Sequence, residues 1–195
     1  MRLFYAFELD EPARRALNEA LQPVRNQVSA RWTHPENLHL TLQFMGEQPA
    51  AAIPGLTDAL QAASGDTRPF SVSFAGFGTF RAASGLLWVG MASGPEPAWL
   101  VSRLRQQLLA RGFDVEKRPW QPHLTVARDA VLIEKTLPPW PAAPIRCRID
   151  RVTLMESVRL EGRLVYRPLA RTPLNDKQPS DDTFKEDDHE EPGQT

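Results

Sequence analysis

A four-residue pattern occurs twice in this chain, as HLTL beginning at His39 and as HLTV beginning at His123. In an extended strand, successive side chains point to opposite faces. Each copy therefore predicts a strand whose histidine and threonine share one face, while the two apolar side chains face a core. Any fold for this chain must accommodate two strands with the same polar face, one in each half of the sequence.

The paired pattern also suggests chemistry. A single histidine in such a strand is more often a hydrogen-bonded structural residue than a catalyst, because a motif match is only a hypothesis. Two copies favour a catalytic role instead. Imidazole titrates near neutrality, so one ring can accept a proton while the other donates one. Thr41 and Thr125 place a hydroxyl beside each ring, and two hydroxyls suit the non-bridging oxygens of a phosphate.

This arrangement fits phosphorus chemistry better than acyl transfer. In-line attack puts the entering and leaving oxygens on opposite sides of phosphorus, so an acid and a base are needed on opposite walls. No protein nucleophile is required, and we interpret Cys147 as a core or strand residue. The histidines lack metal-ligand spacing, and the chain contains neither a His-Glu-x-x-His motif nor a Walker-type loop. We assign no chemical role to His34 or His189.

The remaining periodicity predicts an α+β domain. The expected strands cover residues 3–9, 38–44, 70–77, 86–91, 122–127, 145–155 and 163–169, and the expected helices cover 11–28, 53–63 and 95–111. Asp10 should cap the first helix, Pro23 should kink or split it, and Gly112 should end the third. A hairpin is expected around Glu161 and Gly162.

Charge divides the chain into two parts. Residues 176–195 carry eight acids and two bases, a net charge of −6, and residues 1–175 carry +5. We therefore expect one domain over 1–175 and a disordered acidic tail over 176–195. The domain is too weakly basic to coat nucleic acid non-specifically. The absence of a long apolar run or a signal peptide predicts no membrane association, and the single cysteine favours a cytoplasmic protein.

The two motifs and their flanks resemble the 2H phosphoesterase superfamily, and in particular its bacterial RNA 2′,3′-cyclic phosphodiesterase branch, the LigT-like or 2′-5′ RNA ligase proteins. The matching stretches lie at 1–9, 35–47, 87–90, 122–128 and 152–157. They are spread across nearly all of residues 1–170. The acidic tail lies outside the family pattern.

The resemblance implies a fold of two lobes related by pseudo-twofold symmetry, each an antiparallel sheet with outer helices, and an active-site cleft between them. It implies hydrolysis of an RNA-terminal 2′,3′-cyclic phosphate to a 2′-phosphate without a metal or cofactor, together with reversible ATP-independent 2′-5′ RNA ligation. On this basis His39 would donate a proton to the leaving 3′-oxygen and His123 would accept one from water. Thr41 and Thr125 would hold the phosphate oxygens. The residues themselves do not fix the order of the two histidines.

Four other residues have two interpretations each. Arg128, five residues after His123, can bind phosphate or be an ordinary surface arginine. Phe44, five residues after His39, can stack on a base as in this family, but strict alternation favours a place in the core. Trp88 and Trp120 can stack on bases or be buried.

The expected partner is an RNA or oligonucleotide with a 2′,3′-cyclic phosphate end, bound by a monomer. Two alternatives remain. The same site could hydrolyse another small cyclic phosphate, such as a cyclic nucleotide or a cyclic ADP-ribose phosphate. The chain could also be a non-catalytic RNA-end binding protein that uses both imidazoles only as hydrogen-bond donors. The sequence leaves the physiological RNA and the role of the tail open.

Overall fold

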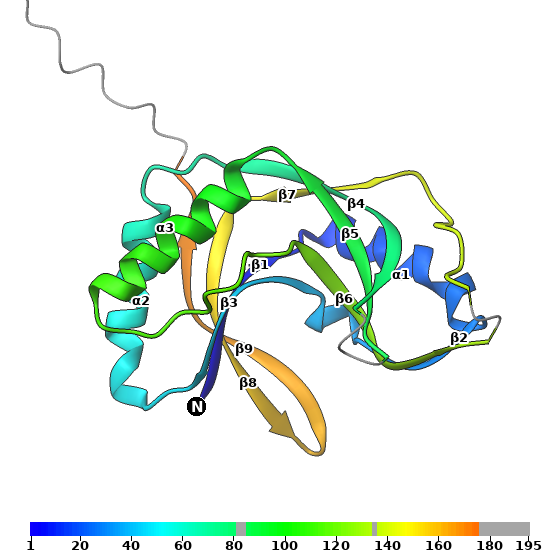
Figure 1. Ribbon diagram of the computed structural model, residues 1–195, viewed down its shortest axis with the longest axis horizontal. Helices are drawn as coiled ribbons and strands as arrows, with labels where there is room; N and C mark the ends of the chain where they lie inside the picture. Colours follow the sequence, from blue (N-terminus) through cyan, green and yellow to red (C-terminus); the bar gives the residue numbers. More distant parts are fainter. Residues whose placement is uncertain (81–84, 134–135, 176–195) are drawn as a thin grey trace, which may run out of the picture.

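The computed structural model describes residues 1–80, 85–133 and 136–175, so the expected acidic tail lies outside the described residues (Figure 1). The elements follow in the order β1 (Arg2–Glu8), α1 (Glu11–Arg25), β2 (Val28–Trp32), η1 (Pro35–Asn37), β3 (His39–Glu47), η2 (Ala50–Ala52), α2 (Ile53–Ser64), β4 (Phe70–Thr79), β5 (Leu87–Ser93), α3 (Glu96–Ala110), β6 (His123–Leu132), β7 (Ile145–Ile149), β8 (Arg151–Leu160) and β9 (Arg163–Pro173). The fold is α+β, as expected.

The strands among the described residues form one nine-stranded sheet with the order β7-β4-β5-β6-β3-β1-β8-β9, and β2 pairs with β6. All of these pairings are antiparallel. The sheet is strongly curled, like half of a barrel (Figure 1). The expectation of a separate sheet in each lobe is therefore wrong, because β3 and β6 join the two sets of strands.

The junction between the two halves of the sheet is narrow. Strands β3 and β6 pair only through Leu40 and Leu124, the apolar residues inside the two motifs. Both leucines are fully buried, so the contact that joins the halves also belongs to the core. One half contains β3, β1, β8 and β9, and the other contains β6, β5, β4, β7 and β2. Each half thus contributes one motif strand to the centre of the sheet.

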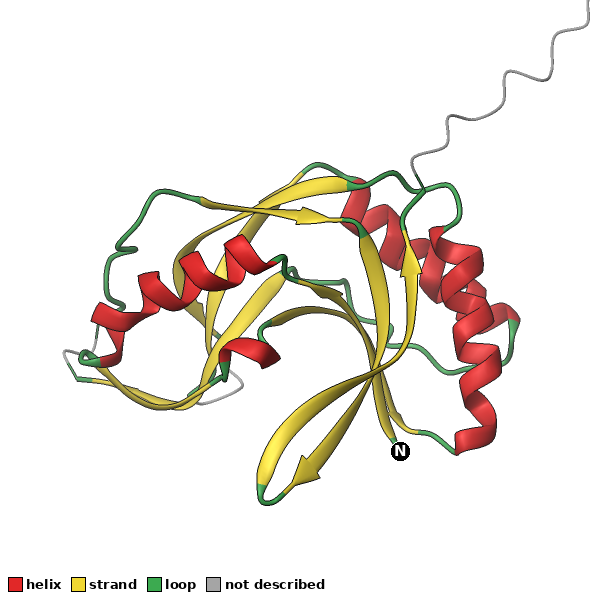
Figure 2. Ribbon diagram, turned by 180° about the vertical axis from the view of Figure 1, so that it is seen from behind, coloured by secondary structure: helices red, strands yellow, loops and turns green. Residues whose placement is uncertain are grey.

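The helices lie outside the curled sheet. Helix α1 packs near β7 and β2, whereas α2 packs on β8, β9 and α3 (Figure 2). The side chain of Asp10 caps α1 by accepting a hydrogen bond from the backbone N–H of Ala13 at 2.8 Å, as expected. No helix of the described residues has the length and apolarity needed to cross a membrane.

Two sequence expectations about elements fail. Helix α1 is not split at Pro23 and continues to Arg25, because a proline close to a helix end removes one backbone hydrogen bond and leaves the earlier turns intact. Val28, expected in that helix, instead begins β2. The segment 145–155 is also not one strand. It is divided at Asp150 into β7, which pairs with β4, and β8, which pairs with β1 and β9.

The β8–β9 hairpin confirms the expected turn. Glu161 and Gly162 have φ angles of 50° and 78°. A two-residue hairpin loop with positive φ at both positions has the twist that suits antiparallel strands. The hairpin extends away from the body of the molecule on the concave side of the sheet (Figures 1 and 2).

Candidate active site

The first motif strand keeps its alternation only as far as Thr41. Leu40 and Leu42 are buried, and His39 and Thr41 are partly exposed. Beyond that point, Thr41 lies opposite Ala6 and Gln43 lies opposite Tyr5, so the strand contains one additional residue, a β-bulge.

The bulge determines where Phe44 lies. Gln43 is buried directly after the buried leucine, and Phe44 then returns to the face of His39 with 52% of its surface exposed. Its ring lies 5.9 Å from that of Phe4, which also contacts His39. The core interpretation of Phe44 is therefore wrong, because a one-residue bulge moves every later side chain to the opposite face.

The second motif strand has the same irregularity. Trp88 of β5 lies opposite Thr125 and Leu87 lies opposite Ala127, so Val126 is the additional residue. Val126 and Ala127 are both buried, and Arg128 is exposed. Arg128 consequently shares the face of the second motif's histidine and threonine. The residues five positions after the two histidines thus occupy matching places on the two strands.

The two imidazoles are held in the same way. Nδ1 of His39 lies 2.7 Å from the carbonyl oxygen of Asn37, and Nδ1 of His123 lies 2.8 Å from that of Gln121. In each case the carbonyl belongs to the residue two positions earlier. A carbonyl oxygen only accepts hydrogen bonds, so Nδ1 must carry the proton. Nε2 of each ring is left to exchange protons with a bound molecule.

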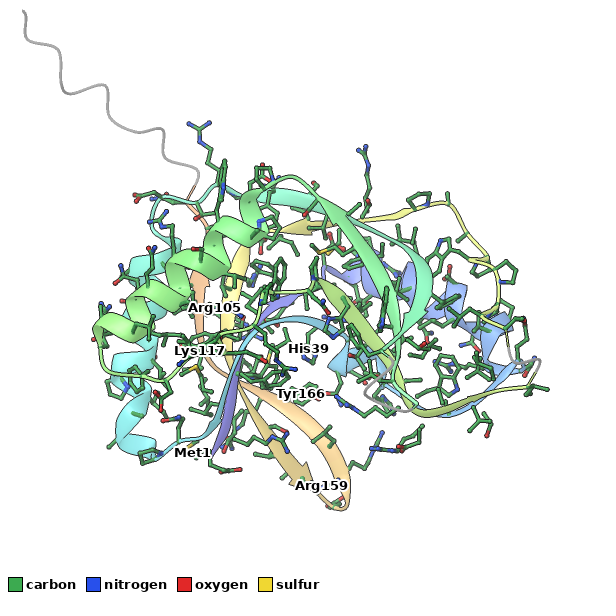
Figure 3. All side chains as sticks on the ribbon, in the orientation of Figure 1. Met1, His39, Arg105, Lys117, Arg159 and Tyr166 are labelled. Atoms are coloured by element: carbon green, nitrogen blue, oxygen red, sulfur yellow. The ribbon has the colours of Figure 1, made fainter. Side chains whose placement is uncertain are left out.

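His39 has an apolar surrounding. Its ring lies 5.0 Å from Phe4 and makes an edge contact with Tyr166 at 4.8 Å (Figure 3). Burial lowers the pKa of His39 to about 4, and Arg128 and His123 lower it by repulsion, whereas the hydrogen bond to the Asn37 carbonyl acts in the opposite direction. His39 is therefore neutral at pH 7 in the unliganded protein.

Thr41 is placed to interact with this neutral ring. Its Oγ1 lies 3.0 Å from Nε2 of His39, and because Nδ1 holds the proton, the hydroxyl donates to Nε2. Arg128 and His123 both affect the pKa of His39, so these two side chains of β6 lie close to the ring on β3. Arg128 also lowers the pKa of Tyr166, which burial raises.

Each motif threonine is also held through its backbone. The carbonyl of Thr41 accepts a hydrogen bond from Nε1 of Trp120 at 2.9 Å, and the carbonyl of Thr125 accepts one from the hydroxyl of Thr33 at 3.2 Å. Trp120 precedes β6 and bonds to β3, whereas Thr33 precedes β3 and bonds to β6. The segment that leads into each motif strand is therefore hydrogen-bonded to the other motif strand. Trp120 is partly buried and packs against the core. It is a structural residue here.

Trp88 supports the second histidine indirectly. Its ring lies 5.6 Å from that of Phe80, which makes an edge contact with His123 at 4.9 Å. The indole covers Gly78, where a Cβ would overlap its ring atoms. Trp88 is thus packed between a glycine and an aromatic residue, and Phe80 contacts the imidazole.

The sequence analysis missed three aromatic residues of the site, namely Phe4, Tyr166 and Phe80. Phe4 was visible as part of an aromatic strand, but that strand is apolar on both faces. Tyr166 and Phe80 reach the histidines only because distant segments pair in the sheet, and neither has a local signal. Phe4 and Tyr166 contact His39, and Phe80 contacts His123.

Glu8, the residue opposite His39 on β1, is already paired. A cavity of about 150 Å³ adjoins His39, and Glu8, Asn37 and Arg171 contribute to its lining. Burial would raise the pKa of Glu8, but hydrogen bonds from Arg171 and Thr153 lower it overall, so Glu8 is ionised. Within the described part of the chain, no group of three or more His, Cys, Asp and Glu side chains is arranged to hold a metal ion.

Six of the eight residues singled out by the sequence thus lie on one face of two neighbouring strands: His39, Thr41, Phe44, His123, Thr125 and Arg128. The arrangement offers two nitrogen atoms for proton transfer, two hydroxyls, one guanidinium group and an exposed aromatic ring. These groups can bind a small anion and move protons on and off it.

Comparisons with known proteins show the family and the fold to which this chain is similar. Residues 9–161 match the family model of the 2′-5′ RNA ligase superfamily. An RNA 2′,3′-cyclic phosphodiesterase of Escherichia coli is 31% identical over 176 residues, which cover 89% of this chain and 96% of the relative. One of Geobacillus stearothermophilus is 29% identical over 88% of this chain, but the match spans only 56% of that protein. The crystal structure of Escherichia coli LigT complexed with 3′-AMP superimposes with a TM-score of 0.74 and 30% identity, covering 89% of this chain and 97% of that one.

Proposed function

The chain belongs to the 2′-5′ RNA ligase superfamily, and from that premise we propose that it hydrolyses RNA-terminal 2′,3′-cyclic phosphates to 2′-phosphates. The observation that carries the proposal is the identical anchoring of two histidines on neighbouring strands, each with Nδ1 bonded to a carbonyl, which makes Nε2 the nitrogen that can exchange protons. Relatives named RNA 2′,3′-cyclic phosphodiesterase support the substrate class.

In the proposed reaction, water attacks phosphorus and the bond from phosphorus to the 3′-oxygen breaks. Nε2 of His123 accepts a proton from the water, and Nε2 of His39 donates one to the departing 3′-oxygen. The Thr41 and Thr125 hydroxyls and the Arg128 guanidinium bind the non-bridging oxygens, whose charge they stabilise. No metal ion or cofactor takes part.

The low pKa of His39 must be reconciled with its proposed role as the proton donor. A proton donor must be protonated before the bond breaks, yet His39 is neutral at pH 7 without substrate. A phosphodiester bound beside the ring carries a negative charge, and an opposite charge raises the pKa of an imidazole. Substrate binding is therefore the step that charges His39.

Three further proposals accompany the reaction. Phe44, exposed beside Phe4, stacks on the terminal base. The same groups run the reverse reaction, joining RNA ends through a 2′-5′ linkage without ATP. The two halves of the sheet are related by approximate twofold symmetry, which is supported by the repeated bulges and the repeated histidine anchors.

The direct test uses adenosine 2′,3′-cyclic phosphate with EDTA present, and identifies the product by ³¹P NMR. We expect adenosine 2′-phosphate to form at the rate measured without EDTA. A 3′-phosphate product, or loss of activity with EDTA that returns on adding a divalent cation, contradicts the proposal. Tight binding without turnover supports the RNA-end binding protein instead, and faster turnover of a cyclic ADP-ribose phosphate than of cyclic-phosphate RNA supports the alternative substrate.

A further inference from the structure

The concave face of the sheet continues beyond His39 onto β1, β8 and β9. Phe4, which contacts His39, lies two residues from Arg2 on β1, so both side chains lie on the same face. Arg2 lies opposite Ser157 of β8, and Ser157 lies opposite Tyr166 of β9. Burial raises the pKa of Tyr166, and Arg128 and Arg2 oppose that shift, so the Arg2 guanidinium lies near the phenol.

The same face extends along the β8–β9 hairpin. Arg159 lies two residues beyond Ser157, and it pairs with Leu164, two residues before Tyr166. The register is regular over this stretch, so Arg159 shares the face of Tyr166. At about 3.3 Å per residue, each of these two-residue steps covers roughly 7 Å. Figure 3 shows Arg159 near the hairpin tip and Tyr166 nearer to His39.

The three arginines of β9 are engaged. Arg163 bonds to His34, Arg167 to Glu156 and Arg171 to Glu8. These three residues are therefore held by partners within the protein and are less available to an added ligand.

Arg2 and Arg159 differ from them. Both are exposed, and neither has a carboxylate partner within residues 1–80, 85–133 and 136–175. Arg159 reaches only the Gly162 carbonyl, at 3.4 Å. Glu47, opposite Arg2 on β3, is paired at 3.2 Å with the amino terminus of Met1.

We propose that Arg2 and Arg159, here called the arginine strip, bind the phosphates of the nucleotides that precede the cyclic-phosphate end. The inference rests on the proposed function and names its substrate class: single-stranded RNA ends, in preference to cyclic mononucleotides. Arginine beside exposed aromatic rings is the combination that holds single-stranded nucleic acid without reading its sequence. The strip begins next to Phe44 and Tyr166, so a strand leaving the catalytic histidines along β1 and β8 meets it.

The test compares two substrates, adenosine 2′,3′-cyclic phosphate and a short oligoadenylate with the same cyclic end. In the double variant Arg2→Ala/Arg159→Ala, we expect kcat/KM for the oligonucleotide to fall roughly three- to thirtyfold, as for two exposed charge contacts. The value for the mononucleotide should stay within about twofold. Arg146→Ala is the matched control, because Arg146 is an exposed arginine on β7 in the other half of the sheet. Thermal unfolding of each variant shows that it is folded.

Salt dependence gives an independent measure. Each phosphate contact to a single strand contributes a slope of about 0.7 in a plot of log affinity against log salt concentration. The double variant should therefore show a slope for oligonucleotide binding that is shallower by about 1.4. Fluorescence anisotropy with a labelled oligoadenylate bearing a 3′-phosphate measures this binding without turnover.

The possible outcomes separate the two proposals. Equal losses on both substrates, or no loss on the oligonucleotide, overturn the arginine strip and leave the hydrolytic function standing. If the wild type hydrolyses neither substrate, the proposed function fails, and the anisotropy titration alone decides whether the arginine strip binds RNA. Unchanged anisotropy in the double variant, or equal affinity for an acidic peptide, also overturns the strip.

Discussion

At the scale of single residues, the two histidines have the same anchor but different surroundings. His39 is enclosed by Phe4 and Tyr166, whereas His123 is contacted at its edge by Phe80. Burial takes the pKa of His39 to about 4, far below the value of about 6.5 that an unfolded chain would show. This difference between folded and unfolded states has a measurable effect on stability.

Since the folded pKa of His39 is lower, the unfolded state binds more protons between pH 6.5 and 4, and stability falls as the pH decreases through that window. Below about pH 4 this contribution becomes constant. Between pH 6.5 and 4, we expect the free energy of unfolding of the wild type to fall by about 1–3 kcal/mol more than that of His39→Asn. Each unit of difference in pKa corresponds to about 1.4 kcal/mol. Urea unfolding at several pH values measures the difference. Parallel curves for the two proteins would show that His39 is not buried in its neutral form.

The order of acid and base can be tested with a better leaving group. In the 2′-(4-nitrophenyl phosphate) of 3′-deoxyadenosine, nitrophenolate replaces the 3′-oxygen and leaves without a proton. If His39 is the acid, His39→Ala should lose at least about a hundredfold in kcat on the cyclic phosphate and recover most of that loss on the nitrophenyl ester. His123→Ala should be impaired on both substrates. Recovery by His123→Ala alone would reverse the two roles.

At the scale of elements, the site is built by two bulged strands, β3 and β6. Each is hydrogen-bonded to the segment that precedes the other. The bulges at Leu42 and Val126 bring Phe44 and Arg128 to the face of the histidines. The indole of Trp120 links the segment before β6 to the backbone of β3. Long-range hydrogen bonds thus add to the Leu40–Leu124 pairing that joins the two motif strands.

Trp120→Phe removes the indole N–H and keeps an aromatic ring. We expect a loss of about 0.5–1.5 kcal/mol in unfolding free energy, the typical value of one hydrogen bond, and a lower kcat because Thr41 is less well positioned. Trp140→Phe is the matched control, since the Trp140 indole makes a longer bond of 3.4 Å in an exposed loop. Urea unfolding and steady-state kinetics of both variants measure the two effects. Equal losses of stability and kcat in the two variants would show that the Trp120 indole does not position β3.

Sequence patterning predicted the polar faces of the motif strands, because alternation around His39 and His123 is a local property. It could not predict the bulges, because an additional residue is defined only against the register of the partner strand. Phe44 was misplaced for that reason. Nor could it predict one continuous sheet, because the Leu40–Leu124 pairing that joins the halves involves two ordinary core residues.

At the scale of the whole molecule, charge is distributed unevenly. Residues 1–175 carry +5 and residues 176–195 carry −6. The positive charges near the site include Arg128 and the arginine strip, so residues 1–175 attract an anionic strand. The near-neutral net charge of the whole chain does not reveal this attraction. The acidic segment lies outside the part of the chain that matches the family.

Deleting residues 176–195 should leave turnover of a cyclic mononucleotide unchanged, because the proposed catalytic groups all lie within β3 and β6. At low salt the deletion should at most tighten oligonucleotide binding, since it removes a net charge of −6. Kinetics and anisotropy at two salt concentrations measure both effects. A loss of turnover would make the acidic segment part of the catalytic machinery.

The central claim is that His39 and His123 act as one acid–base unit on a cyclic phosphate. The most direct measurement is kcat/KM on a 2′,3′-cyclic phosphate for the wild type, His39→Ala, His123→Ala and the double variant. Residues that act as a unit have strongly non-additive effects. We predict that each single variant loses at least about a hundredfold and that the double variant loses little more. Turnover near the wild-type level in either single variant would contradict the account.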